Sequence, residues 1–360
     1  MRRGSRAFAA AVTVSALIAA PAPAFAAGPP MGHAGLQNRL DRVVAAGAVG
    51  AIAEVRRKHD LWRGASGAAE YGTTRPVPID SRFRIGSVTK TFVAVVVLQL
   101  VAEGRLRLDD TVFPGRAVTV RHLLGHTSGV PDYRPTLPMP PSPGFFANRW
   151  RTWTPDELIG RVATLPPVFE EPGSKFDYSN TNYLLLGKII ENVTGHPYAK
   201  EIERRVTGPL RLRGTSLPGT SPRLRGPHPH GYVPGETGLV DLTEMNPSVM
   251  GAGGEMISTT ADLQRFLARL LGGHLLPDRL LAKMKTPGTA TRDYGLGLSW
   301  WTTSCGLRVY GNDGDALAYQ TWTFATEDAS RLVTVAVTPD FTADLDDAVE
   351  AFVDAAICAD

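Results

Sequence analysis

Ser87 and Lys90 have side chains and a spacing that could do chemistry together. Residues three apart share one face of a helix, so the serine hydroxyl and the lysine amine can meet there. A serine becomes a nucleophile when a neighbouring base takes its proton, and a desolvated lysine can be that base. The same four-residue pattern is also typical of a capping serine followed by a solvated lysine, so the rest of the chain has to decide.

Tyr178, Ser179 and Asn180 form a second candidate cluster, in a predicted loop that follows Pro172-Gly173. Loops between helices often carry functional groups. A tyrosine hydroxyl can relay or accept a proton where nearby lysines lower its pKa, and an asparagine amide offers a donor and an acceptor to a substrate amide. Taken alone, Tyr178 is equally a packing aromatic residue with a satisfied hydroxyl.

The elements that must position these residues follow from hydrophobic periodicity. The segment from Ser87 to Gly104 is apolar on nearly every side, which predicts a fully buried helix. Strands are predicted at 51–55, 61–69, 295–302, 307–310, 316–325 and 331–337, and further helices at 36–44, 154–163, 183–192, 198–206, 260–271 and 343–357. Strands thus lie at both ends of the chain, whereas helices and proline-rich loops fill the middle.

This distribution predicts an α/β (α+β) fold with a mostly antiparallel sheet built from both chain ends and flanked by helices. The predicted sheet domain comprises residues 27–105 and 290–360. Residues 106–289 are predicted to form an inserted, mainly helical domain.

Residues 1–26 have the pattern of a secretory signal peptide. Arg2 and Arg3 precede a short apolar run that ends at Ala24-Phe25-Ala26, so cleavage is expected near Ala26 and the protein is expected to be secreted. A buried N-terminal helix is the alternative. The run is too short for a comfortable membrane span and no cysteine follows it, so no stable membrane anchor is expected.

Charge and cysteine content exclude several classes of function. Three of the 38 basic residues lie in the expected leader, which leaves the remainder balanced against 35 acidic residues and gives no support for a nucleic-acid partner. Cys305 and Cys358 suit an oxidising compartment; a bridge between them would contribute about 4 kcal/mol, and two free buried thiols are the alternative. No cysteine–histidine cluster is present, so neither a metal nor a cofactor is expected.

In their order, these motifs resemble the penicillin-recognising serine hydrolases, in particular the D-alanyl-D-alanine carboxypeptidase and class C β-lactamase branch. The resemblance covers roughly residues 35–358 and extends to three further segments: Arg121-x-Leu123-Leu124-x-His126-Thr127-Ser128-Gly129, Gly253-Gly254-x-Met256-x-Ser258-Thr259-x-x-Asp262-Leu263 and Tyr294-Gly295-Leu296-Gly297. Secreted actinomycete carboxypeptidases of this family also carry a cysteine pair placed like Cys305 and Cys358.

The resemblance implies a β-lactamase/transpeptidase-like fold and an acyl-transfer mechanism. Ser87 would be acylated after Lys90, with or without Tyr178, removes its proton. Tyr178 would then pass a proton to the leaving group, and Asn180 would orient the substrate amide. The backbone N–H groups of Ser87 and Asp315 would form the oxyanion hole.

The strand motif departs from the family, which has K-T-G or H-x-G where this chain has Asn312-Asp313-Gly314-Asp315. The Asn312 amide can still donate a hydrogen bond, and Gly314 would let the strand lie close to the substrate. Asp313 and Asp315 add negative charge, which should repel a terminal carboxylate on the substrate. Like charges ~4 Å apart at an effective dielectric near 20 repel by about 4 kcal/mol. A family arginine that holds the substrate carboxylate is replaced by Ser299-Trp300-Trp301.

The sequence therefore predicts a secreted serine hydrolase that acts on an amide, an ester or a substrate with a free amine, as an esterase or a D-peptidase would. A catalytically impaired homologue that binds peptidoglycan or peptides is the alternative. An α/β-hydrolase is excluded because Gly125-His126-Thr127-Ser128-Gly129 lacks the G-x-S-x-G spacing. The same segment cannot serve as the strand motif either, because it belongs to the predicted helical region. The expected partner is a small-molecule or peptide substrate, including cell-wall material, and a monomer is expected.

Overall fold

One six-stranded antiparallel sheet organises the described chain, with strand order β2-β1-β12-β11-β10-β9. The computed structural model describes residues 32–58, 60–113, 116–287 and 293–359, so the expected signal peptide at 1–26 lies outside the described residues. The strands are β1 Ala48–Arg57, β2 Asp60–Gly67, β9 Ser299–Thr302, β10 Arg308–Asp315, β11 Gln320–Thr326 and β12 Arg331–Pro339. Because β1 pairs with both β2 and β12, strands from the two ends of the chain meet in the middle of the sheet, as predicted.

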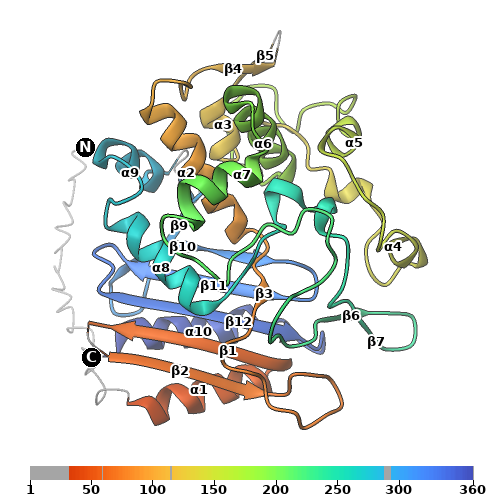
Figure 1. The fold of residues 1–360 in the computed structure, drawn as a ribbon, viewed down its shortest axis with the longest axis vertical. Coiled ribbons are helices and arrows are strands. Elements are labelled where there is room, and N and C mark those ends of the chain that lie inside the picture. Colours follow the sequence, from red (N-terminus) through yellow and green to blue (C-terminus); the bar gives the residue numbers. More distant parts are fainter. Residues whose placement is uncertain (1–31, 59, 114–115, 288–292, 360) are drawn as a thin grey trace, which may run out of the picture.

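Helices cover both faces of this sheet (Figure 1). Helices α1 (His33–Ala45) and α10 (Asp346–Cys358) pack on one face and enclose a smaller hydrophobic core. Helices α2 (Val88–Ala102) and α8 (Thr260–Leu271) pack on the other face, within the main core. Helix α8 belongs to the segment predicted as the helical insertion, yet it packs directly on β1, β11 and β12.

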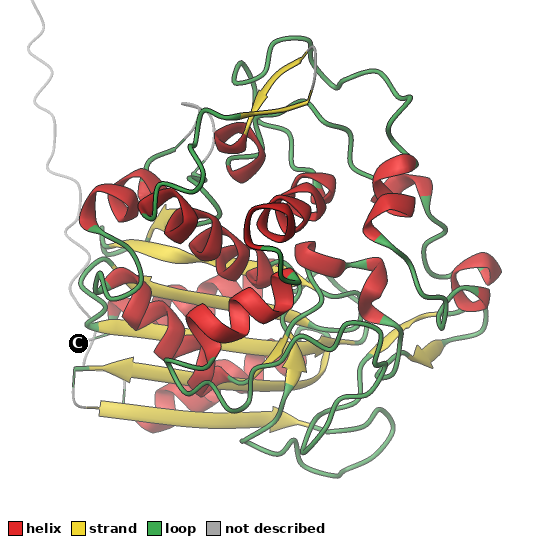
Figure 2. Cartoon of the chain, turned by 45° about the horizontal axis from the view of Figure 1, so that its top comes forward, coloured by secondary structure: helices red, strands yellow, loops and turns green. Residues whose placement is uncertain are grey.

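Apart from one helix of 15 residues, the remaining elements are short, and long loops connect them, as Figure 2 shows. The helices are α3 Val120–Leu124, α4 Pro143–Ala147, α5 Pro155–Gly160, α6 Asn180–Thr194, α7 Tyr198–Ile202 and α9 Asp278–Lys285. Two-stranded pairs join β3 Phe83–Arg84 to β8 Ile257–Ser258, β4 Thr111–Phe113 to β5 Arg116–Thr119, and β6 Tyr232–Pro234 to β7 Leu239–Asp241. Apart from β3 and β8, these pairs are hairpins with few residues between their strands.

Local sequence signals explain where several of these helices begin and end. At α5, the Thr154 hydroxyl accepts a hydrogen bond from Glu157 N–H and the Glu157 carboxylate accepts one from Thr154 N–H, which is a capping box. Pro155 occupies the first helical position, where its missing N–H costs no hydrogen bond. Gly195 ends α6 with φ of 76°, a conformation that favours glycine.

The end of β10 differs from the prediction. The strand runs on to Asp315, whereas residues 316–319, predicted as strand, form the turn into β11. The Asp315 carboxylate accepts a hydrogen bond from Leu317 N–H at 2.6 Å, and Leu317 has a positive φ of 68°. An aspartate that bonds the backbone two residues later favours a turn over a continuing strand.

Cys305 and Cys358 form a disulfide, which confirms the bridge over the free thiols. It ties the connection between β9 and β10 to the last residue of α10. None of the helices in the described ranges is long and apolar enough to cross a membrane.

Candidate active site

Ser87 lies at the start of α2 in a tight turn. Gly86 before it has φ of 49°, and a Cβ on Gly86 would stand 2.5–2.7 Å from the backbone of Asp315. Glycine is therefore required for the turn to approach β10. The Ser87 side chain makes no capping hydrogen bond to the helix, so its hydroxyl is not the cap that the alternative interpretation supposed.

Lys90 is completely buried, with no exposed surface. Its Nζ lies 2.9 Å from Ser87 Oγ, 2.8 Å from Asn180 Oδ1 and 2.6 Å from the carbonyl oxygen of Gly253. Burial lowers the pKa of Lys90 to about 7, although the carboxylates of Asp132 and Asp313 oppose this. A neutral amine has two N–H donors for Asn180 and Gly253, and it keeps a lone pair for the Ser87 hydroxyl. This is the arrangement of a general base.

Tyr178 reaches the nucleophile from the start of α6. Its hydroxyl donates a hydrogen bond to Ser87 Oγ at 2.7 Å. Although 37% of the residue is exposed, burial of the hydroxyl raises the pKa of Tyr178 well above its usual value, and Asp313 acts in the same direction. The shift is thus opposite to the lowered tyrosine pKa considered from the sequence, and a neutral hydroxyl can pass a proton while a neutral lysine can accept one.

His126 supports Tyr178, a role that the sequence did not reveal. The imidazole is fully buried and stacks on the tyrosine ring at 4.2 Å between centroids. Its Nδ1 accepts a hydrogen bond from Ser179 N–H at 3.2 Å. Burial and the nearby Lys90 hold the pKa of His126 well below its usual value, so the ring is neutral. The segment around His126, although it is no strand motif, therefore holds Tyr178 against Ser87.

Asn180 is held between the side chains of Lys90 and Asp132. Its Oδ1 faces Lys90, whereas its Nδ2 donates to Asp132 Oδ2 at 3.0 Å and its backbone N–H donates to Asp132 Oδ1 at 3.2 Å. Asp132 lies in the proline-rich loop and was not a sequence candidate. Neither its residue type nor its neighbours in the sequence marked it as a site residue.

Strand β10 approaches Ser87 from the other side. Asn312 is buried, and its Nδ2 lies 3.4 Å from the carbonyl oxygen of Ser87 and 3.3 Å from Thr91 Oγ1. A Cβ on Gly314 would stand 2.1 Å from the carbonyl oxygen of Ile85. Glycine at 314 is thus needed for contact with the turn at Ser87, whereas contact with the substrate was the reason expected from the sequence.

The ladder between β10 and β11 fixes the direction of the Asp315 N–H. Ala316 N–H bonds to Tyr319 O at 2.8 Å, so the next pair along, Asp315 opposite Gln320, is not hydrogen-bonded across that ladder. The Asp315 N–H therefore points away from β11, toward the edge where the Ser87 turn lies. The backbone thus allows the oxyanion hole expected from the resemblance.

The two aspartates of the strand motif differ in their positions. Asp315 lines the pocket beside Ser87, while its carboxylate also holds the turn at Leu317. Asp313 has exposed surface, yet the protein that surrounds its carboxylate displaces water from it. This desolvation raises the pKa of Asp313, while Lys90 opposes the shift. The expected negative charge is therefore present near the nucleophile.

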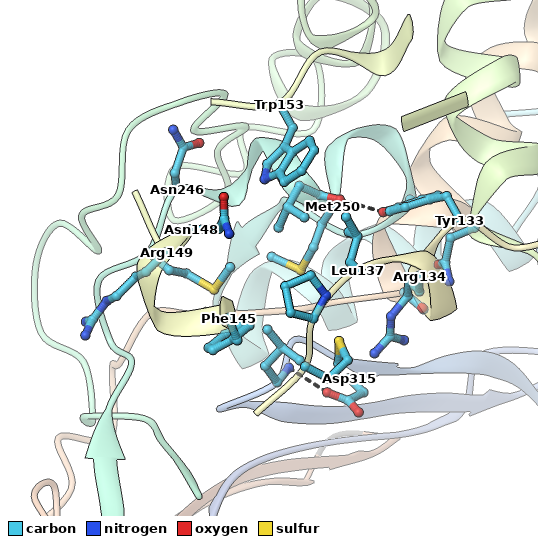
Figure 3. A pocket seen from close by; sticks show the side chains of 18 residues that line it. Tyr133, Arg134, Leu137, Phe145, Asn148, Arg149, Trp153, Asn246, Met250 and Asp315 are labelled. Carbon is cyan, nitrogen blue, oxygen red and sulfur yellow. Dashed lines mark hydrogen bonds between the residues drawn. The ribbon is translucent and has the colours of Figure 1, made fainter. Parts of the chain in front are cut away.

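The pocket next to Ser87 is mainly apolar and is drawn in Figure 3. Its apolar lining comprises Leu137, Pro138, Met139, Phe145, Trp153, Met245, Val249, Met250 and Leu317. Arg134 and Asp315 lie on one side of it (Figure 3). Arg134, which was not a sequence candidate, adds a cation to a pocket where Asp313 and Asp315 were the charged groups predicted beside the substrate. Within the described residues, no cluster of histidine, cysteine or acidic side chains could hold a metal ion.

The sheet of terminal strands, its helical layers and the serine–lysine–tyrosine cluster define the β-lactamase/transpeptidase fold. Residues 36–358 match the Beta-lactamase family, and the chain belongs to that family, whose members are serine hydrolases.

Solved structures and a characterised sequence relative agree with this membership. A D-stereospecific amidohydrolase from Streptomyces sp. is 38% identical, with a TM-score of 0.80 over 89% of this chain and 98% of that one. D-amino acid amidase from Ochrobactrum anthropi SV3, solved with L-phenylalanine amide, is 27% identical, with a TM-score of 0.77 over 89% and 97% of the two chains. Penicillin-binding protein 4 from Amycolatopsis lactamdurans is 32% identical over 69% of this chain. The match spans only 66% of that protein's length.

Proposed function

We propose that this protein is an active serine hydrolase that forms an acyl-enzyme at Ser87 and cleaves an amide bond, with activity toward simple esters as well. The observation that carries the proposal is the position of Ser87 Oγ, 2.9 Å from Lys90 Nζ and 2.7 Å from the Tyr178 hydroxyl. A homologue that only binds peptides has no need of a buried lysine with a pKa of about 7 against its serine.

In the proposed reaction, neutral Lys90 takes the proton of Ser87 as Oγ attacks the substrate carbonyl. The N–H groups of Ser87 and Asp315 stabilise the oxyanion, and each such donor is worth roughly 3–4 kcal/mol. Tyr178 gives its proton to the leaving amine and regains one from the Lys90 ammonium. Water then attacks the acyl-enzyme, and the same groups move protons in the reverse direction.

The substrate class follows from the pocket and from the relatives. An apolar wall beside the nucleophile suits a bulky apolar side chain. Two similar structures are described as a D-stereospecific amidohydrolase and a D-amino acid amidase. The strand motif, with Asn312 and Asp313, supplies no cation for a terminal carboxylate, and the arginines of the pocket, Arg134 and Arg149, come from other segments of the chain. We therefore assign amides or short peptides of apolar D-amino acids as substrates, ahead of penicillins and D-Ala-D-Ala peptides.

The test compares D- and L-phenylalanine amide, a D-Ala-D-Ala peptide and a fluorescent penicillin, with wild type and Ser87→Ala in parallel. Release of ammonia from the D-amide by wild type alone, with an acyl adduct on Ser87 by intact mass, is the expected result. p-Nitrophenyl acetate serves as the generic acyl donor. Neither adduct nor turnover with any of these compounds, or an adduct that persists in Ser87→Ala, would refute the proposal.

We also propose that the protein is secreted, with cleavage near Ala26. Two features support export: the leader pattern of residues 1–26, and the Cys305–Cys358 disulfide, which an oxidising compartment maintains. N-terminal sequencing of protein recovered from culture medium tests this, and retention of the full-length chain inside the cells would contradict it.

A further inference from the structure

Helix α6 begins at Asn180 without a cap of its own. The preceding residue, Ser179, makes no side-chain hydrogen bond to the helix. The first N–H groups of a helix need acceptors from elsewhere, and a negative charge is favourable at this end. Asp132 supplies both, because its Oδ1 accepts the Asn180 backbone N–H at 3.2 Å. The cap of α6 therefore comes from a loop 48 residues earlier in the chain.

The same carboxylate also determines the orientation of the Asn180 side chain. Asp132 Oδ2 can only accept, so it selects the Nδ2 side of the amide, at 3.0 Å. The carbonyl oxygen of the amide must then face Lys90, where it lies 2.8 Å from Nζ. With the amide turned over, a carboxylate would face an oxygen and a lysine would face an N–H group. Both contacts would be unfavourable.

Asp132 is itself held in place. Its Oδ1 also accepts the Arg134 N–H at 3.3 Å. The adjacent Pro131 carbonyl accepts the Thr181 hydroxyl at 2.7 Å, and this hydroxyl accepts the Tyr133 N–H at 3.0 Å. Thus the loop and the start of α6 are joined by hydrogen bonds on both sides of the carboxylate.

We propose that Asp132 is a positioning residue, which fixes the Asn180 amide so that its oxygen holds the Lys90 amine against Ser87. This inference rests on the function proposed above, because it gives Asp132 a part in preparing the base. Asp132 also acts on Lys90 through its charge, which favours the protonated amine. The other titratable or charged groups around Lys90 are Arg134, Asp313, Tyr178, Tyr183 and His126.

Two substitutions separate positioning from simple space filling. In Asp132→Asn the new amide can place an N–H group against Asn180 Nδ2, which drives the Asn180 amide to turn its own N–H toward Lys90. Asp132→Ala leaves space in which a water molecule can act as acceptor. We therefore expect Asp132→Asn to lose about 100-fold in kcat/KM, as for a misplaced catalytic group, and to be less active than Asp132→Ala. A space-filling role predicts the opposite order.

The pH profile gives a second readout. Both substitutions remove a charge that raises the pKa of Lys90, so the acid limb of kcat/KM should move to lower pH. Asp262→Asn is the matched control. Asp262, in the first turn of α8, accepts the Gly214 N–H at 2.7 Å, and neither residue lines the pocket next to Ser87. That variant should lose thermal stability, with its kcat/KM and acid limb unchanged.

The experiment measures hydrolysis of p-nitrophenyl acetate and D-phenylalanine amide against pH, and titrates the ¹³Cε resonance of Lys90 in lysine-labelled protein. An Asp132→Asn variant as active as wild type, or an acid limb and Lys90 resonance that titrate as in wild type, would overturn the role of Asp132. If wild type neither turns over nor becomes acylated, the proposed function is wrong. The Lys90 titration then still decides whether Asp132 acts on this amine.

Discussion

Replacing Gly314 by alanine tests the contact between β10 and the turn that carries the nucleophile. The added Cβ would lie 2.1 Å from the carbonyl oxygen of Ile85 and 2.8 Å from the backbone nitrogen of Ser87. Ordinary van der Waals contact begins at 3.4 Å. The strand and the turn must therefore separate by about 1 Å, because neither contact involves a flexible side chain.

This separation should damage the oxyanion hole, whose two N–H groups lie on opposite sides of the contact. Loss of one such donor lowers kcat by about 10²–10³-fold, or roughly 3–4 kcal/mol. We expect Gly314→Ala to show a loss of this size in kcat. Overpacking should lower the free energy of unfolding by only about 1–3 kcal/mol.

The assay is single-turnover acylation by p-nitrophenyl acetate together with steady-state hydrolysis of D-phenylalanine amide, with thermal unfolding measured on the same samples. Gly160→Ala on α5 is the control, because a Cβ there would meet no atom within 4 Å. It should acylate like wild type. A folded Gly314→Ala variant whose kcat stays within about threefold of wild type would refute the reasoning from this contact.

Three further predictions follow from the same structure. Activity should rise with pH through the pKa of Lys90, about 7, because only the neutral amine can accept the Ser87 proton; a kcat/KM profile flat from about pH 5 to 9 would contradict this. The double change Asn312→His with Asp313→Thr should speed acylation by benzylpenicillin by about tenfold, since it removes a negative charge beside the site, and an unchanged rate in stopped-flow would count against that charge. Serine in place of both Cys305 and Cys358, 53 residues apart, should cost about 4 kcal/mol and lower Tm by roughly 10 °C in calorimetry, whereas an unchanged Tm would show that the bridge adds no stability.

Features encoded over a few neighbouring residues were predictable from the sequence. The buried helix from Ser87 and the helix that opens at Thr154 depend on contacts within one or two turns, and both begin where they were predicted to begin. Ser87 and Lys90 come together for the same reason, because they share one helix face. That Tyr178 lies beside Ser87 was predicted only through the family resemblance, because the distance between the two residues depends on how α6 packs on α2.

Contacts between distant segments left no readable pattern. The carbonyl oxygen of Gly253 that accepts from Lys90 is a backbone atom, so its residue type carries no information about the contact. Asp132 lies in a loop whose prolines indicated only irregular structure. The sequence also could not show whether the pKa of Tyr178 is raised or lowered, because the shift depends on burial of the hydroxyl by other parts of the chain.

The departure at the strand motif bears on the base as well as on the substrate. A lysine at position 312, as in the family motif, would place a cation near Lys90 and favour its neutral form. Asn312 provides no charge, and Asp313 raises the pKa of Lys90. Burial, helped by the charge of Arg134, therefore has to keep the amine neutral against Asp132 and Asp313, without a cation from the strand motif. It follows that a change on the strand which admits a carboxylate substrate should also lower the pKa of Lys90, so that substrate preference and working pH change together.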